Sequence, residues 1–376
     1  MNKKRVVLIS PSIFDRDAVG SAVIQMYQAL AGASEFEVEI LCRRCELNIP
    51  ATRVDSISDL LLHPSFLFAD IIIYFFAIYS PLFDAIPVGN GRALQIVRFH
   101  NITPVEFSSK ENEQLIKRSF DQVANFYDCD EIWCDSEENR RTLLKIGLND
   151  NKISVIPLSS AKSNRGALAG KAHDFFQIVY VGRFVPSKGI LRMLEEFAFA
   201  KASIDRPVFL KLIGNAKLSD DYYIKSVHET IEQFKLHDSV EILNDIDDNE
   251  LSKIYGESHV FLSGSYHEGF GMPVVEAIAS GCIPVTYANS NLRYISNGLG
   301  RAVEDRTHAL SEALVEVLNG LAIAYLDWES EVLPLDAGSM SLTTFDRATA
   351  AYTANFNPQV FSKRIYDRLI SQNSNQ

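Results

Sequence analysis

Two glutamates stand eight residues apart in a glycine-rich segment that has the features of an anion-binding site. The segment runs from Ser263 to Gly281 and reads SGSYHEGFGMPVVEAIASG. Its pattern predicts a strand end, a loop that holds Glu268, and a short helix that holds Glu276 and stops at Gly281. The free amides and the positive dipole end of such a helix attract anions, and loop glycines let a ligand approach the backbone closely. The plainer alternative is a capping loop in which Glu276 is a solvated partner of the helix dipole.

Two cations stand five residues apart upstream of this segment. Arg183 and Lys188 belong to the stretch VGRFVPSKG at residues 181–189, which predicts a strand followed by a loop and a helix. Fixed Arg and Lys charges can stabilise negative charge that builds up on a leaving group, without a metal ion. The alternative is an ordinary pair of surface cations.

Together the two segments resemble glycosyltransferase family 4, retaining enzymes of GT-B fold with an E-x7-E motif and nucleotide-sugar donors. The resemblance implies that Glu276 holds the donor ribose hydroxyls, that Glu268 lies near the donor sugar, and that Arg183 and Lys188 stabilise the departing diphosphate. It also assigns sugar and phosphate contacts to the loop residues Gly269, Phe270, Gly271 and Met272, and contact with the base to Asn244, Asp245 and Ile246.

The N-terminal half is expected to supply the acceptor site and two further parts of the reaction centre. Arg98–Pro104 (RFHNITP) ends a predicted strand and resembles the family's histidine loop, which places His100 at the transferred sugar. Taken alone, a histidine at a strand end is more often a structural residue whose ring nitrogens are satisfied. The loop Ser12–Ser21, which includes Asp15 and Arg16, resembles the glycine loop that meets the diphosphate. Gly20 is its only glycine, where many relatives have a pair.

Short apolar runs alternate with amphipathic stretches along most of the chain, which is typical of parallel sheets with helical crossovers. Predicted helices include 21–30, 190–201, 221–234, 248–258 and 273–280. Predicted strands lie at Val6–Ser10, Phe36–Leu41, Asp70–Phe76, Leu94–Phe99, Glu131–Cys134, Gln177–Val181, Val208–Ile213, Val240–Leu243, Val260–Ser263 and Ile283–Thr286.

The alternation predicts an α/β protein of GT-B type, with two Rossmann-like doubly wound parallel-sheet domains facing across a cleft. Residues 1–165 would form the acceptor-side domain and residues 166–357 the domain that binds the nucleotide sugar. A linker is expected within Ser159–Asp174, where the periodicity lapses. Residues 358–376 would form a C-terminal helix that can cross back to the first domain. The stretch Tyr325–Thr344 has no clear period.

The composition of the chain excludes several classes of protein. The chain has 376 residues, with 36 Lys and Arg against 48 Asp and Glu, hence a net charge of −12. Nucleic acid is excluded as the main partner because binding it requires a basic surface. Five cysteines do not make a disulfide scaffold, so a reducing cytoplasm is expected. The longest apolar stretch, residues 71–79, is far shorter than the ~20 residues of a spanning helix. Lys110, Lys117 and Arg118 allow peripheral contact with the inner face of a membrane, but a solvated helix face explains them equally well.

Several short motifs match metal-binding sequence patterns. Asp128–Asp130 and Asp245–Asp247 both match D-x-D, and Cys42–Cys45 is a single C-x-x-C. Three-residue matches are common in an acidic chain, and zinc sites ordinarily need a second ligand pair. We therefore expect no metal, and no cofactor besides the nucleoside-diphosphate sugar as co-substrate.

The resulting prediction is a metal-independent retaining hexosyltransferase. It would move a hexose from a nucleoside-diphosphate sugar to a hydroxyl of a saccharide acceptor, free or lipid-linked, in polysaccharide or glycolipid assembly. Three alternatives stay open: a nucleotide-sugar epimerase, a sugar phosphorylase of GT-B fold, and an inactive relative that acts as a binding partner.

Overall fold

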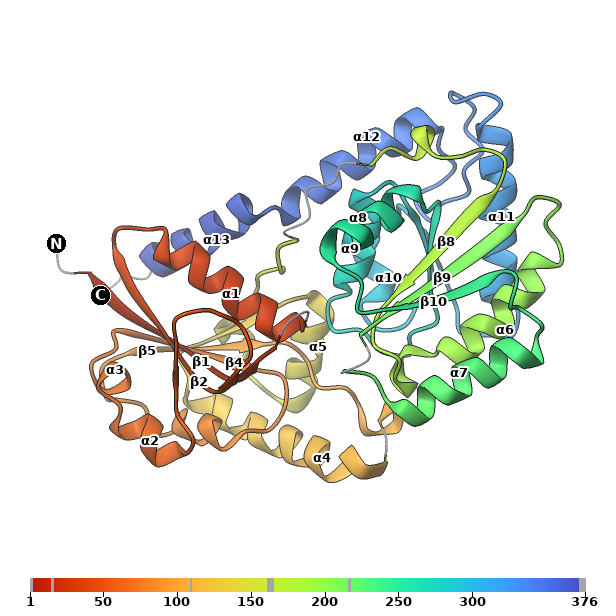
Figure 1. Ribbon diagram of the computed structural model, residues 1–376. Helices are drawn as coiled ribbons and strands as arrows, with labels where there is room; N and C mark the ends of the chain where they lie inside the picture. Colours follow the sequence, from red (N-terminus) through yellow and green to blue (C-terminus); the bar gives the residue numbers. More distant parts are fainter. Residues whose placement is uncertain (1–2, 15–16, 109, 161–165, 216–217, 372–376) are drawn as a thin grey trace. The chain divides into compact units, whose positions relative to one another are not determined.

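The protein folds into two compact units, each built around one parallel sheet (Figure 1). The computed structural model describes residues 3–14, 17–108, 110–160, 166–215 and 218–371. Unit 1 comprises residues 1–159 together with residues 356–376, and unit 2 comprises residues 160–355. Residues 161–165, which include the last residue before the predicted boundary at 165/166 and part of the predicted linker, lie outside the described residues, as do Asp15 and Arg16 of the first loop.

Unit 1 has a seven-stranded sheet with the order β3-β2-β1-β4-β5-β6-β7, and all its described strand pairs are parallel. This order reverses direction between β1 and β4, as in doubly wound folds. The strands are β1 Lys4–Ile13, β2 Phe36–Cys45, β3 Ala51–Arg53, β4 Ile71–Phe76, β5 Leu94–Phe99, β6 Glu131–Cys134 and β7 Ile153–Val155. The helices are α1 Ala18–Ala31, α2 Ile57–Leu62, α3 Pro64–Leu67, α4 Glu113–Gln122, α5 Glu137–Ile146 and α13 Pro358–Ser371.

The centre of unit 1 is β4, whose residues Ile71–Phe76 are all buried. A strand that is covered on both faces reads as a continuous apolar run, so this long hydrophobic stretch is core. The described residues contain no helix long and apolar enough to cross a membrane.

The C-terminal helix α13 belongs to unit 1, where it packs against α1. Arg368 on α13 forms two hydrogen bonds with Glu131, at 3.0 and 3.1 Å. Tyr366 donates to Glu35 at 3.1 Å, and its ring meets Phe36 edge to face. The last part of the chain therefore completes a unit that begins at the N-terminus.

Unit 2 repeats the same sheet plan with the strand order β10-β9-β8-β11-β12-β13, again all parallel. The strands are β8 Phe176–Val181, β9 Val208–Gly214, β10 Val240–Asn244, β11 Val260–Ser263, β12 Ile283–Tyr287 and β13 Arg301–Val303. The helices are α6 Ile190–Lys201, α7 Asp221–Gln233, α8 Asp248–Glu257, α9 Met272–Ala279, α10 Leu292–Ile295, α11 Ala309–Ala324 and α12 Leu342–Thr353.

The two strands at the reversal point of this second sheet, β8 and β11, are neighbours. Ligands of doubly wound sheets bind at the carboxyl ends of the strands at such a point. The loop after β8 holds Arg183 and Lys188, and the loop after β11 holds Glu268. The fold therefore brings the two predicted motifs to one edge of one sheet.

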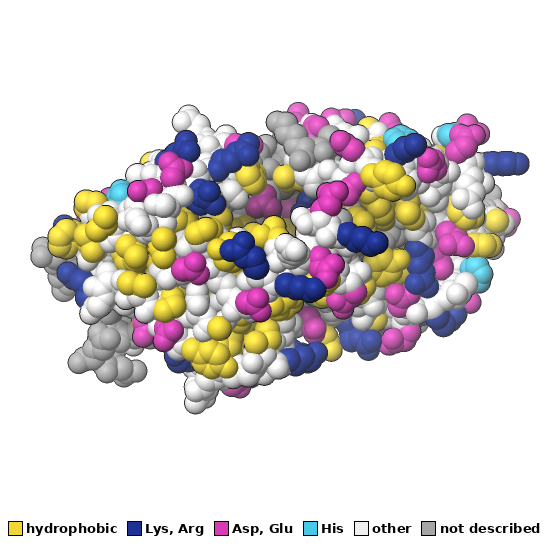
Figure 2. All heavy atoms as spheres, turned by 90° about the horizontal axis from the view of Figure 1, so that it is seen from below, with side chains coloured by type: hydrophobic (Ala, Val, Ile, Leu, Met, Phe, Trp, Pro, Cys, Tyr) yellow, Lys and Arg dark blue, Asp and Glu magenta, His cyan; other side chains and the backbone are white. Residues whose placement is uncertain are grey.

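Residues 325–344 have no clear hydrophobic periodicity in the sequence. In the structure they contain one isolated antiparallel bridge, between Leu333 and Met340, and lead into α12. On the face drawn in Figure 2, basic and acidic side chains are interspersed rather than gathered by sign.

Candidate active site

The loops after β8 and β11 touch each other through their backbones. Gly189, which precedes α6, has a left-handed φ of +58°, and a Cβ placed on it would lie 2.1 Å from the carbonyl oxygen of Gly264. A Cβ on Gly264 would in turn lie 2.7 Å from the Gly189 oxygen. The Tyr266 amide donates to the Ser187 carbonyl at 2.9 Å. Only glycines allow this approach, which fixes the spacing between the cationic loop and the acidic loop.

That spacing brings Lys188 and Glu268 together, although they are 80 residues apart in the sequence. Lys188 Nζ lies 2.5 Å from Glu268 Oε1, and the two side chains are only 16% and 18% exposed. Ser265 Oγ also donates to Glu268 Oε1, at 3.1 Å, and is itself 3.1 Å from Ser263 Oγ. Glu268 is therefore held by a cation and a hydroxyl next to the start of α9.

Helix α9 begins directly after the acidic loop. Gly271 is its N-cap with a φ of +92°, and no side chain caps its first turn. The helix starts at Met272, so Pro273 occupies the second helical position, and Gly281 follows the end of the helix with a φ of +73°. Pro273 has no N–H and the Val274 amide donates to the Gly271 carbonyl at 3.0 Å, so an anion at this helix start would be met by the remaining amides and by the helix dipole.

The second glutamate of the motif occupies a different environment. Glu276 lies inside α9, and its Oε2 accepts a hydrogen bond from the Tyr255 hydroxyl at 3.4 Å. Burial is the main cause that raises the pKa of Tyr255 well above its usual value, so this hydroxyl stays a donor. The two acids therefore have separate partners, a lysine for Glu268 and a tyrosine for Glu276.

Arg183 lies at the same edge but is exposed, and its guanidinium pairs with no carboxylate among the described residues. Its backbone oxygen accepts from the Tyr180 hydroxyl at 3.3 Å. Phe270, in the acidic loop, is buried, and its carbonyl accepts from Asn291 Nδ2 at 2.5 Å. Asn289 Nδ2 donates to the Ser265 carbonyl at 3.2 Å. The loop is thus tied to the segment after β12.

Asn244 ends β10, and one of the acids after it has a structural role. The Asp247 side chain caps α8 by accepting from the Glu250 amide at 2.8 Å. Asp245 has a left-handed φ of +54°. Capping is therefore the role that the structure gives to Asp247 of this D-x-D match.

In unit 1, His100 follows β5 and its Nδ1 lies 2.7 Å from Asp135 Oδ2. Asp135 follows β6 and also pairs with Arg98. Sequence reasoning missed Asp135. The available signal was its place directly after the strand Glu131–Cys134, next to the strand that ends before His100.

Gly20 has a different position from the one expected. It lies in the first turn of α1 rather than in a loop, because Asp17 caps this helix and accepts from the Gly20 amide at 3.0 Å. A Cβ at Gly20 would lie 2.6 Å from the Phe14 oxygen. Close packing of α1 against the end of β1 therefore accounts for this glycine, and its amide is already used.

The remaining short motifs hold no metal-like cluster. Among the described residues, no group of three or more His, Cys, Asp or Glu side chains could hold a metal ion. Cys42 and Cys45 are free thiols, and burial is the main cause that raises the pKa of Cys42 to about 11. Asp130 accepts from the Gln95 amide at 2.7 Å.

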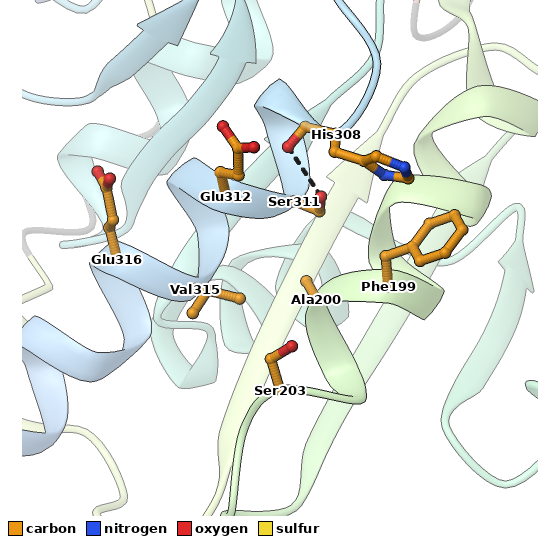
Figure 3. A pocket seen from close by; sticks show the side chains of 8 residues that line it. All are labelled: Phe199, Ala200, Ser203, His308, Ser311, Glu312, Val315 and Glu316. Atoms are coloured by element: carbon orange, nitrogen blue, oxygen red, sulfur yellow. Dashed lines mark hydrogen bonds between the residues drawn. The ribbon is translucent and has the colours of Figure 1, made fainter.

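A surface hollow of about 430 Å³ lies between α6 and α11. Figure 3 shows the side chains that line it. The His308 ring meets Phe199 edge to face at 4.4 Å, and Ser311 Oγ donates to the His308 carbonyl at 2.9 Å. None of the predicted site residues lines it. Its lining consists of Phe199, Ala200, Ser203, His308, Ser311, Glu312, Val315 and Glu316.

Comparison with known proteins gives a match to a family model within unit 2. Residues 167–321 match the family model for glycosyl transferases group 1. The group 1 match spans β8 to α11 and so includes Arg183, Lys188, Glu268 and Glu276.

Curated relatives of the chain are glycosyl-transferring or sugar-phosphate enzymes by name. The gpi3 subunit of phosphatidylinositol N-acetylglucosaminyltransferase from Schizosaccharomyces pombe is 23% identical over 250 residues, covering 66% of this chain and 50% of that protein. A human counterpart from the same enzyme is 30% identical over 146 residues, covering 39% and 28%. Mannosylfructose-phosphate synthase from Agrobacterium fabrum is 27% identical over 219 residues, covering 55% and 45%. The chain thus spans half or less of the length of these relatives.

Solved structures match the whole chain and show its fold. Sucrose-phosphate synthase from Thermosynechococcus elongatus matches with a TM-score of 0.76 and 19% identity over 100% of both chains. HepE from Anabaena, solved in complex with UDP-glucose, matches with a TM-score of 0.71 and 14% identity over 97% of this chain and 99% of that one. The protein therefore has the two-domain GT-B fold that was predicted.

Proposed function

We propose that the protein is a retaining glycosyltransferase of family 4 type, which transfers a hexose from a nucleoside-diphosphate sugar to a hydroxyl of a glycan acceptor. The observation that carries this proposal is the Lys188–Glu268 pair, 2.5 Å between Nζ and Oε1, beside the uncapped start of α9. The group 1 match over this region and the UDP-glucose bound to HepE, a structural relative, support the choice of donor.

The chemistry of this edge suits a departing diphosphate. When the glycosidic bond to a nucleoside diphosphate breaks, negative charge accumulates on the leaving group. Lys188, Arg183 and the amides at the start of α9 supply fixed positive charge there. A single preorganised donor of this kind contributes ~3–4 kcal/mol to lowering a barrier. Because the chain's own cations can neutralise the leaving group, we propose that transfer needs no metal ion and no further cofactor.

The other roles follow the E-x7-E pattern. Glu276 would hold the ribose hydroxyls, and Glu268 would lie by the donor sugar together with the amides of the Gly269–Met272 loop. Tyr255 supports the first role, since its hydroxyl orients the Glu276 carboxylate at 3.4 Å. Lys188 supports the second, since it holds Glu268 in the loop. His100 would contact the transferred sugar.

We further propose that unit 1 binds the acceptor, a saccharide that is free or lipid-linked. The transfer reaction would contribute to polysaccharide or glycolipid assembly, in the cytoplasm or at the inner face of a membrane. Relatives named for N-acetylglucosamine transfer to phosphatidylinositol and for mannose transfer to O-antigen chains support a glycan or glycolipid acceptor.

Donor turnover by paired lysine variants tests the proposal. Lys188→Ala should lower the transfer rate 100- to 1,000-fold, as estimated for one lost donor to the leaving group. Lys211→Ala is the matched control, since Lys211 is comparably buried and pairs with Glu241 on β9 and β10, away from the motif loops. Equal rates in the two variants would contradict the proposal.

The same assay separates the alternatives. Isomerisation of a donor without any acceptor would identify an epimerase, and sugar release that depends on inorganic phosphate would identify a phosphorylase. Failure to bind any nucleoside diphosphate would identify an inactive relative. The anomeric configuration of the product, read by NMR, tests retention.

A further inference from the structure

Three buried side chains of unit 1, Arg98, Asp135 and His100, form a row of close polar contacts that ends at His100. Arg98 Nη2 lies 2.6 Å from Asp135 Oδ1, and Asp135 Oδ2 lies 2.7 Å from His100 Nδ1. The side chains of Arg98, Asp135 and His100 are 1%, 3% and 4% exposed. Arg98 also donates to the Ile156 carbonyl at 2.6 Å, which anchors the far end of the row.

Strand register explains why these three residues meet. Phe99 of β5 pairs with Cys134 of β6, so the residues that follow each of them, His100 and Asp135, leave the sheet side by side. Arg98 precedes His100 by two positions and therefore points to the same face of the sheet. Phe75 of β4 is the register partner of Arg98. Its ring stacks on the His100 imidazole, with the two ring centroids 5.8 Å apart and 15° between the ring planes.

This arrangement selects one proton position on the His100 ring. A carboxylate only accepts hydrogen bonds, so the short contact with Asp135 requires the proton on Nδ1. In the neutral ring the other nitrogen, Nε2, is then an acceptor with a free lone pair. Nε2 is buried and has no hydrogen-bond partner among the described residues. Leaving such an atom unsatisfied is unfavourable, and a ligand with a suitable donor would satisfy it.

A second buried histidine, His259, is a comparison within the same protein, because the fold provides partners for both of its ring nitrogens. His259 Nδ1 accepts from the Gln177 amide at 3.0 Å, and its Nε2 contacts the Ala172 carbonyl at 2.8 Å. Both nitrogens are therefore used by the fold, and the backbone donor at Nδ1 requires the opposite tautomer, with the proton on Nε2. His100 differs because only one of its nitrogens is used.

We propose that Asp135 and Arg98 are positioning residues that hold His100 in the Nδ1–H tautomer, so that Nε2 accepts a hydrogen bond from a hydroxyl of the bound sugar. The sugar part of this inference rests on the proposed function. It predicts a preference for sugars that carry a hydroxyl at the contacted position over the corresponding deoxy sugars, since a deoxy sugar would leave Nε2 unsatisfied.

NMR of the protein labelled with ¹⁵N-histidine tests the proposal on the ligand-free full chain at pH 8. Two-bond imidazole correlations distinguish the two tautomers, and loss of a signal in His100→Gln identifies the ring. We expect Nδ1–H for His100 and Nε2–H for His259, which serves as the internal reference. A His100 spectrum with Nε2–H, or with both nitrogens protonated, would overturn the proposal.

Asp135→Asn tests the role of the carboxylate. An asparagine amide donates to Nδ1, so His100 should switch to Nε2–H while His259 keeps its signature, and kcat should fall at least ten-fold. An unchanged His100 tautomer in this variant would overturn the proposal, and if the variant does not fold the wild-type spectrum alone decides. A wild-type chain with the expected tautomer but no transfer activity would contradict the proposed function instead, so the two failures are distinguishable.

Discussion

Substituting Gly189 tests whether the backbone contact between the loop after β8 and the loop after β11 determines the geometry of the site. In Gly189→Ala the new methyl group meets the Gly264 oxygen at 2.1 Å, and the backbone must keep a φ of +58°. The left-handed conformation costs an alanine ~1–2 kcal/mol. Relieving the clash costs a further ~1–3 kcal/mol, as for other overpacked sites. We therefore expect the free energy of unfolding to fall by about 2–5 kcal/mol.

Function should be affected more strongly than stability. The methyl group needs more than an ångström of additional space, so the loop with Lys188 must move away from the loop with Glu268. A misplacement of ~1 Å at a reaction centre can lower the rate 100-fold. We expect a comparable loss of transfer activity, together with weaker binding of the nucleoside diphosphate.

Two matched variants separate strain from contact. Gly91→Ala has a similar φ of +76° but nothing within 4 Å of the new methyl group, so it reports the strain alone. Gly264→Ala meets the Gly189 oxygen at 2.7 Å without a positive φ, so it reports the clash alone. Urea unfolding and initial rates should rank Gly189→Ala as the most damaging, with Gly91→Ala retaining full activity. If Gly189→Ala resembled Gly91→Ala in both measurements, the reasoning would be refuted.

Three further predictions concern what holds each unit together. Burial is the main cause that lowers the pKa of His259 from 6.5 to about 4, so the folded protein takes up this proton later than the unfolded chain as the pH falls. The contribution of His259 to the free energy of unfolding is therefore constant above pH 6.5 and declines between pH 6.5 and 4, by about 3 kcal/mol. Urea titrations of wild type and His259→Gln at several pH values isolate it, and equal pH slopes would contradict it. Arg368→Ala leaves the buried Glu131 carboxylate without its arginine but with the Trp133 indole N–H, and should destabilise unit 1 by about 1–3 kcal/mol. Lys363→Ala, at an exposed position of the same helix, should have no effect. Glu196→Ala removes the acceptor for the His308 and Ser311 amides at the start of α11 and should cost about 2–4 kcal/mol in urea unfolding, whereas the exposed Glu195→Ala should be neutral.

Local patterns were sufficient for most elements of unit 2. The helix predicted at 190–201 and the strand predicted at Val260–Ser263 are confirmed with the same bounds. The three-residue strands β3 and β13 were not predicted, because so short a run has no periodicity of its own and forms only beside a partner strand. Helix α11 was also missed.

The sequence indicated which individual residues belong to the candidate site, but not which of them contact one another. The sequence indicated that Lys188 and Glu268 belong to the chemistry, but no local pattern could join residues 80 positions apart at 2.5 Å. That contact depends on the neighbouring positions of β8 and β11 and on the glycine-to-glycine contact of the loops. Gly20 was misplaced for a similar reason, since the cap at Asp17 starts α1 earlier than the apolar pattern does.

Calorimetric titration of the full chain with a panel of nucleoside diphosphates, including UDP and GDP, tests the central claim most directly. The account predicts that at least one of them binds without added metal. It predicts that Lys188→Ala and Arg183→Ala weaken that binding at least ten-fold, while Lys211→Ala binds like the wild type. Absence of binding by every nucleoside diphosphate, or equal affinity in the wild type and both site variants, would contradict it.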